Sequence, residues 1–178
     1  MKICSCFFSV CFLLVASAAN SEAILRDANH LLELTDLGKQ FDYITRVQTQ
    51  KIIRTYSSIL KTSRSAILPE DIKKQIRSCY ADAYAWKRFS QGIAEILAES
   101  FSHREITLLI EFYSSLGLSP REITNFKSLI KKAKIIEEVS VQYIHENSGS
   151  CVADDSKLIN HFLDSDKIIQ KSTLMTHE

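Results

Sequence analysis

The chain has 178 residues, with 22 basic and 21 acidic side chains, and this near-neutral balance excludes a general electrostatic attraction to nucleic acid or anionic membranes. Its length suits one domain. Only four glycines and two prolines interrupt it. A β-sheet protein of this size needs more turn residues, so we expect an all-α fold.

The first 18 residues have the composition of a secretory signal peptide. Lys2 supplies a positive start, residues 3–15 carry no charge, and small residues follow. The apolar stretch is shorter than the roughly 20 residues of a membrane-spanning helix, and no comparable stretch occurs later. We predict cleavage after Ala18, with Ala19 and Ala23 as alternatives, and a periplasmic or secreted mature protein. The other interpretation is an uncleaved anchor.

Removal of the signal leaves Cys79 and Cys151 as the only cysteines. Two thiols in an oxidising compartment indicate one disulfide, which would close a loop of about 70 residues. The alternative is two separate thiols, with Cys79 packed in a helix. A redox-catalytic role would need a Cys-x-x-Cys motif, which is absent.

The hydrophobic spacing predicts a single-domain bundle of about five to six helices within residues 19–171, followed by a frayed tail at 172–178. The predicted helices start and end near 22–34, 39–62, 69–97, 103–116, 120–147 and 154–171. Pro69 suits the first turn of its helix, where a missing N–H costs nothing. Gly92 would bend that helix, and Asp154 would cap the last one.

Two of these helices have predicted buried faces that the structure can test. In the helix at 120–147, the expected buried stripe is Ile123, Phe126, Ile130, Ala133, Ile136, Tyr143 and Ile144. In the last helix, the expected buried residues are Leu158, Ile159, Phe162 and Leu163.

Two helix starts carry the signature of a capping box with a hydrophobic staple. Ser102 and Glu105 are three residues apart and are flanked by Phe101 and Ile106. The serine oxygen would accept a first-turn backbone N–H, and the glutamate would accept the serine N–H. Residues 118–123 repeat the device, with proline at the first helical position.

Between the two caps, seven of the eleven residues of 106–116 are apolar. A helix that is apolar on most sides is normally surrounded by other helices. We therefore expect a central apolar helix near 103–116.

The sequence shows no assembled catalytic or metal-binding motif. His145-Glu146 lacks the second histidine of a zinc hydrolase motif, and the other histidines stand singly. There is no glycine-rich phosphate loop and no Gly-x-Ser-x-Gly elbow. The acidic pairs at 137–138 and 154–155 are adjacent residues, whose side chains diverge by about 100° on a helix. We predict no metal site and no cofactor.

Two further groups have a structural and a functional interpretation. The basic residues at 131–134 are read as a solvated face, because acidic residues follow within one turn. Tyr80, Tyr84 and Trp86 are read as core and its margin, although they could line a hydrophobic groove.

Within the stretch 93–117 the chain carries Phe101, Ser102, Glu105, Ile106, Phe112, Tyr113, Ser115 and Gly117. In these residues it resembles the bacterial domain of unknown function 2059 family. Residues 31–35 also look like the first helix of that family. The chain lacks the proline that the family commonly has before the glycine. The resemblance implies a helical periplasmic domain and brings no catalytic residue with it.

These observations favour a non-enzymatic exported protein that binds another envelope protein or serves envelope maintenance. In this interpretation Phe101, Ser102, Glu105, Phe112 and Tyr113 are structural residues. One alternative is a carrier of lipid or another apolar ligand. The other is an envelope hydrolase whose site combines Glu105 or His103 with Tyr113.

Overall fold

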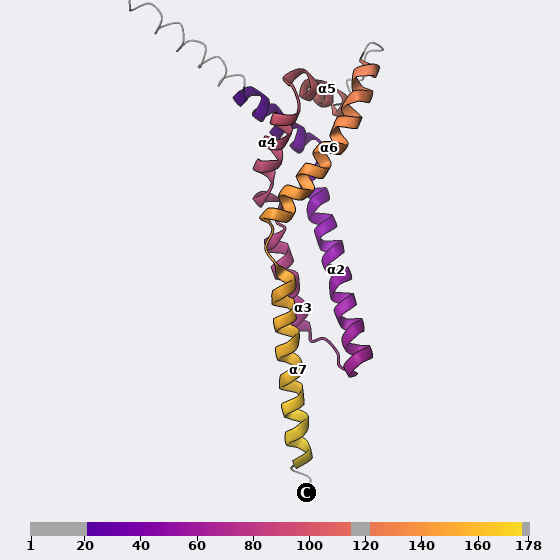
Figure 1. The fold of residues 1–178 in the computed structure, drawn as a ribbon, viewed down its shortest axis with the longest axis vertical. Coiled ribbons are helices and arrows are strands. Elements are labelled where there is room, and N and C mark those ends of the chain that lie inside the picture. The colour runs from indigo at the N-terminus through magenta and orange to yellow at the C-terminus, as the bar shows by residue number, and fades with distance from the viewer. Residues whose placement is uncertain (1–20, 115–121, 176–178) are drawn as a thin grey trace, which may run out of the picture. The chain divides into compact units, whose positions relative to one another are not determined.

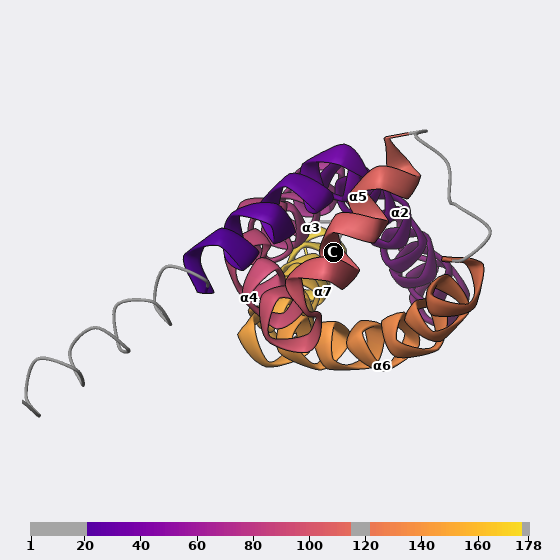
Figure 2. The ribbon, with the colours of Figure 1, turned by 90° about the horizontal axis from the view of Figure 1, so that it is seen from above.

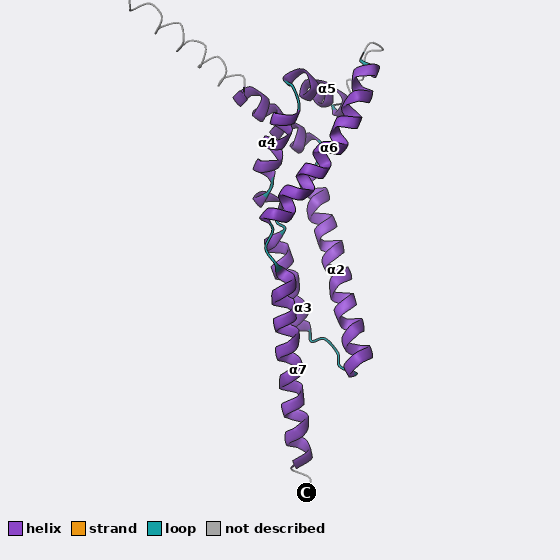
Figure 3. Ribbon diagram, in the orientation of Figure 1, coloured by secondary structure: helices purple, strands orange, loops and turns teal. Residues whose placement is uncertain are grey.

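This computed structural model describes residues 21–114 and 122–175, which form helices joined by short connections (Figures 1 and 3). No strand occurs among the described residues, so the all-α prediction is confirmed there. The predicted signal peptide lies outside the described residues, as do Ser119 and Pro120 of the second capping box and the last three residues of the tail.

The helices follow one another with little intervening chain. After a helical segment at 21–34 come α2 (Leu37–Arg64), α3 (Glu70–Ala83), the 3₁₀ turn η1 (Trp86–Arg88), α4 (Ser90–Ser100), α5 (His103–Tyr113), α6 (Ile123–Asn147) and α7 (Cys151–Met175). The predicted interruption is a turn at residues 35–36, two residues shorter than the expected 35–38, in which Asp36 has a φ of 55°. Aspartate tolerates this left-handed conformation better than most residues.

The chain divides into two compact units, which nothing in the sequence predicts. Unit 1 is built from the described parts of Met1–Gln40 and Trp86–Asn147, and unit 2 from Phe41–Ala85 and Ser148–Glu178. Each unit has its own buried residues.

The division explains why the single helix predicted over 69–97 is wrong. α3 ends at Ala83 and α4 begins at Ser90, so the helix is interrupted before Gly92 and does not bend at that residue. Tyr84 leaves the helical conformation, with φ −113° and ψ 29°. Apolar residues follow a helical spacing on both sides of this break, so the sequence pattern does not reveal it. The two helices belong to different units.

Unit 2 is organised around the packing of α3 against α7. Its hydrophobic core cluster is made of Ile53, Leu60, Leu68, Ile72, Ile76, Tyr80, Ala83 and Cys151. Leu158, Ile159, Phe162 and Leu163 of α7 pack against this core, as predicted. Tyr80 is buried and stacks on Tyr84 with ring centres 6.2 Å apart, so the core interpretation of this pair is confirmed.

The predicted disulfide joins these two helices. Cys79 of α3 and Cys151 of α7 are bridged, with Cα atoms 5.9 Å apart and a sequence separation of 72 residues. Closing a loop of this length in the unfolded chain stabilises the folded state by roughly 4 kcal/mol in the chain-entropy description. α7 begins at Cys151, so Asp154 lies inside the helix and pairs with Lys157 instead of capping the first turn.

Unit 1 is organised around the packing of α4 against α6. Gly92 of α4 lies directly beneath the Tyr143 ring of α6, so closely that a side chain at residue 92 would collide with the ring. Phe89 meets the same ring edge-on, with ring centres 6.4 Å apart. This contact turns the Tyr143 face of α6 toward α4.

The predicted buried stripe of α6 is wrong for Ile123, Ile130 and Ala133, which are exposed, whereas Phe126 is partly buried. Ile136 and Leu129, which precede Tyr143 by one and two heptads, are buried at 6% and 2% exposure. Ile130 and Ile123 are 59% and 48% exposed. Successive residues of a helix are rotated by about 100° around its axis. When Tyr143 faces α4, Ile130, which lies one position after the buried Leu129, therefore points outward.

The expectation that the helix near 103–116 is central is also wrong for the described residues. Only Ile106 and Leu108 of α5 are buried, whereas Phe112 is 40% and Tyr113 51% exposed. α5 is therefore enclosed only in part, and its exposed end contacts α6 through Phe112 and Phe126.

Candidate functional site

The N-terminus of α5 forms the capping box that the sequence predicts. Ser102 is the N-cap, and its hydroxyl accepts the backbone N–H of Glu105 at 3.4 Å. The Glu105 carboxylate in turn accepts the backbone N–H of Ser102 at 2.7 Å and the Ser102 hydroxyl at 2.9 Å. The two residues thus satisfy donors that a helix start leaves free.

A lysine from α6 completes the arrangement, and the sequence does not predict it. The Lys132 ammonium donates to both Glu105 oxygens, at 2.9 and 3.1 Å. The same ammonium lies 5.2 Å from the ring centre of the buried Phe101, within cation–π range. Capping box, staple and ion pair therefore join α5 to α6 at one point.

These contacts determine the charge of Glu105. Partial burial alone would raise the pKa of its carboxyl. The Ser102 N–H, the Lys132 ammonium and the Ser102 hydroxyl outweigh burial and hold the pKa below its ordinary value. Glu105 is therefore an anion with three donors already bound, which is a poor general base.

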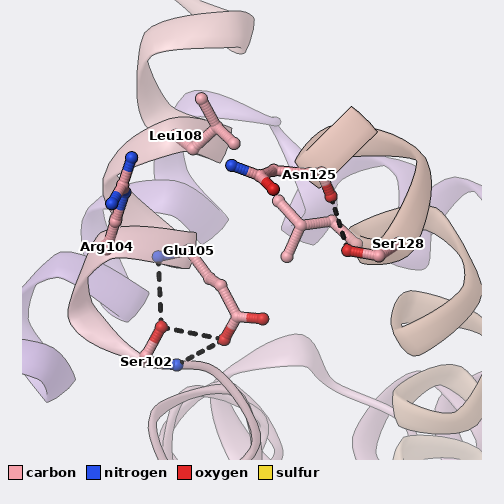
Figure 4. A pocket seen from close by; sticks show the side chains of 7 residues that line it. Ser102, Arg104, Glu105, Leu108, Asn125 and Ser128 are labelled. Carbon is pink, nitrogen blue, oxygen red and sulfur yellow. Dashed lines mark hydrogen bonds between the residues drawn. The ribbon is translucent and has the colours of Figure 1, made fainter. Parts of the chain in front are cut away.

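An open pocket of about 300 Å³ lies beside this group, between α5 and α6 (Figure 4). Its lining residues are Ser102, Arg104, Glu105, Leu108, Asn125, Ser128 and Leu129. The Ser128 hydroxyl donates to the backbone oxygen of Asn125 at 2.7 Å, so it is held by its own helix. The other serine of the pocket, Ser102, donates its hydroxyl to Glu105 within the capping box, so both serine hydroxyls are held by contacts of their own helix start or helix.

The other residues of the hypothetical hydrolase site are used elsewhere. His103 Nε2 lies 2.9 Å from an Asp27 carboxylate oxygen, in a pair that ties α5 to the segment 21–34. Tyr113 contacts Phe112 edge-on, and Phe112 packs against Phe126 of α6 with ring centres 4.5 Å apart. Glu105, His103 and Tyr113 thus serve three separate contacts.

Unit 2 contains a buried carboxyl that sequence reasoning missed. Asp155 is fully buried, and neither of its oxygens forms a hydrogen bond of normal geometry. Burial raises its pKa, an effect that the nearby Tyr80 and Tyr56 hydroxyls reduce but do not cancel. Burial and the Asp155 carboxyl likewise raise the pKa of both tyrosines. The sequence feature that could have indicated its burial is its position four residues after Cys151, which places both residues on the same face of α7.

Two negative findings apply to the described residues alone. Among them, no group of three or more His, Cys, Asp or Glu side chains is arranged to hold a metal ion. No described helix combines the length and the apolar character that crossing a membrane requires.

Comparison with known proteins gives no further guidance: no protein-family model, curated protein or solved structure matches the chain. Function is therefore inferred from the geometry of the chain itself.

The capping box yields the first testable prediction. Ser102→Ala removes the acceptor for the Glu105 N–H and should lower the free energy of unfolding by about 1 kcal/mol. The matched control is Ser128→Ala, which lines the same pocket but lies inside a helix and should change stability by less than about 0.5 kcal/mol. Urea unfolding followed by circular dichroism measures both. Equal losses in the two variants would show that Ser102 is not the cap.

Asp155 yields a prediction about pH. Because its pKa is higher in the folded protein, the folded state binds more protons than the unfolded chain just above pH 4. Its stabilising effect is present below the unfolded pKa and is lost as pH rises through the folded pKa. Asp155→Asn stays neutral, so it should be about 1–3 kcal/mol more stable than the native protein near pH 7.

The control for this measurement is Asp154→Asn, because Asp154 is exposed and paired with Lys157. Urea unfolding at a series of pH values should show a flatter stability profile above pH 4 for Asp155→Asn only. An unchanged slope in that variant would mean that Asp155 does not titrate as its burial requires.

Proposed function

We propose that this protein is an exported, non-catalytic interaction module that binds a protein partner through the outer surface of α6. The observation that carries this proposal is the exposure of aliphatic side chains along that one helix. They are Ile123 at 48%, Ile130 at 59%, Ile135 at 63%, Val139 at 48% and Val141 at 60%. Ile123, Ile130 and Val141 share one face of the helix, and Ile135 and Val139 lie toward another side. Single exposed aliphatic residues are common on proteins, but several on one face of a helix favour a binding site.

The surroundings of these residues favour a protein partner. Lys127, Lys131, Lys134, Glu137 and Glu138 are exposed on the same helix and alternate with the aliphatic side chains. Both signs of charge are present, so the surface lacks the uniform basic character that anionic lipid or nucleic acid would favour. An apolar contact with a polar, solvent-accessible rim is the usual composition of a protein–protein interface.

The disulfide supports the export part of the proposal. Cys79 and Cys151 are bridged in unit 2, and such bonds persist in oxidising compartments such as the periplasm or the extracellular space. This agrees with the signal peptide predicted at residues 1–18 and with the compartment that the family resemblance implies.

The two alternative functions receive less support. The hydrolase alternative required Glu105 or His103 to meet Tyr113, and these side chains serve separate contacts. The lipid-carrier alternative requires a roomy apolar cavity. The most apolar pocket described, between α2 and α3, has about 260 Å³ and is bordered by Arg46 and Arg77. That is below the usual range of about 300–1,000 Å³ for ligand sites.

Site-specific photo-crosslinking tests the proposed surface. A benzophenone amino acid placed at Ile130 should give a discrete covalent adduct with a polypeptide on irradiation of cells that produce the protein. The control position is Glu99 of α4, which is also exposed to solvent but lies on a different helix. Absence of an adduct at Ile130, or equal adducts at both positions, would contradict the proposed surface.

The non-catalytic part needs its own measurement. The purified native protein should hydrolyse ester, peptide and glycan substrates no faster than the purified Glu105→Gln variant does. Turnover that this substitution abolishes would overturn the proposal, because Glu105 would then act in chemistry rather than as a cap.

A further inference from the structure

We propose that the protein partner of α6 is a second copy of this chain, bound antiparallel along one stripe of the helix. This inference rests on the proposed use of α6 as a binding surface. The stripe, called the outer stripe below, consists of Ile123, Lys127, Ile130, Lys134, Glu137 and Val141. All six side chains are exposed.

The spacing of the outer stripe is that of a coiled-coil seam. Its residues follow one another at alternating intervals of four and three positions, so they lie along one face of the helix. The face lies apart from the stripe of Leu129, Ile136 and Tyr143 that packs inward in unit 1. Figure 2 shows α6 along the opposite edge of this unit from the segment 21–34, so the helix has an outer side.

The four central residues of the outer stripe are complementary to themselves when the stripe is reversed. Ile130 and Val141 are equally far from the point midway between Ile135 and Ile136, and so are Lys134 and Glu137. A two-fold axis at that point places Ile130 opposite Val141 of the second copy. It also places Lys134 opposite Glu137 of the second copy. By symmetry each contact occurs twice, as in any isologous dimer.

Residues beside the outer stripe add a second pair of opposite charges. Lys131 and Glu138 flank the seam on the same side, and in the antiparallel arrangement each approaches the other in the second copy. Within the described part of the chain, Lys131, Lys134, Glu137 and Glu138 form no ion pair, in contrast to Lys132, which binds Glu105. Their charges are therefore available to a second copy.

The shape of the surface agrees with this arrangement. A shallow hollow of about 310 Å³ lies at the centre of the outer stripe and is lined by Lys134, Glu137, Glu138 and Val141. The hollow lies next to the two-fold point, where side chains of the second copy would enter it.

Charge also selects the orientation. In a parallel pair in the same register, Lys134 would face Lys134 and Glu137 would face Glu137. Like charges placed opposite each other at an interface are unfavourable, so the pattern supports the antiparallel dimer alone. One helix per copy makes a small interface, and we expect a dissociation constant on the order of micromolar.

Charge exchange tests the proposal with the protein produced from the full chain. Sedimentation equilibrium from about 1 to 200 μM should show a monomer–dimer equilibrium, a range that spans the expected micromolar constant. Lys134→Glu and Glu137→Lys should each weaken the dimer about tenfold or more, because each replaces two attractive contacts with two repulsive ones.

The restored combinations separate self-association from other causes. The double variant Lys134→Glu/Glu137→Lys regains complementarity and should dimerise like the native protein. An equimolar mixture of the two single variants should form a mixed dimer, because each copy then carries the charges that match the other. Lys51→Glu and Glu99→Lys, which change exposed charges outside α6, should leave the equilibrium unchanged. Circular dichroism verifies that every variant is folded.

The outcomes distinguish this inference from the proposed function. A native protein that is monomeric throughout the range, or a dimer that Lys134→Glu leaves intact, overturns the self-association. If the photo-crosslinker at Ile130 then captures a different protein, the interaction module stands and the second copy is excluded as its partner. An adduct of twice the chain mass at Ile130, together with recovery in the double variant, supports both.

Discussion

Tyr143 lies across Gly92, and the missing side chain at that glycine is what lets α6 approach α4 so closely. The Phe89 ring meets Tyr143 from a second direction, so the tyrosine is held in one place. Because a helix is rigid over its length, holding one residue sets the direction of all the others. Leu129 and Ile136 consequently turn inward, and Ile130 turns outward.

Both surfaces discussed for function depend on this rotation of α6. It brings Lys132 to the Glu105 carboxylate, so the capping box of α5 is locked to α6 and its glutamate is occupied. The same rotation leaves Ile123 and Ile130 exposed to solvent. A helix that uses one stripe to complete its unit and another to bind a partner needs no catalytic group. This agrees with a pocket whose serine and glutamate are already bound within the chain.

Features encoded by a few neighbouring residues could be predicted from the sequence. The capping box of Ser102 and Glu105 and the helix that follows it depend on local hydrogen bonds, and the bridge of Cys79 to Cys151 follows from their being the last two cysteines. The rotation of α6 could not be predicted, because apolar residues lie on more than one side of this helix. Leu129 and Ile136 are buried, Ile123 and Ile130 are exposed, and the packing of Tyr143 on Gly92 favours this choice. For a similar reason the exposure of α5 and the burial of Asp155 were missed. Both depend on which helix lies opposite, not on the residues beside them.

The free energy of unfolding of Gly92→Ala, measured with and without Tyr143→Leu, tests this constraint most directly. With Tyr143 present, the added methyl group collides with the ring, so the substitution should lower stability by about 1–3 kcal/mol. With leucine at residue 143 the collision is relieved, and the better helix propensity of alanine should raise stability by up to about 1 kcal/mol. A change of sign between the two backgrounds is the predicted result. The same effect of Gly92→Ala in both would show that Tyr143 does not hold α6 at this rotation.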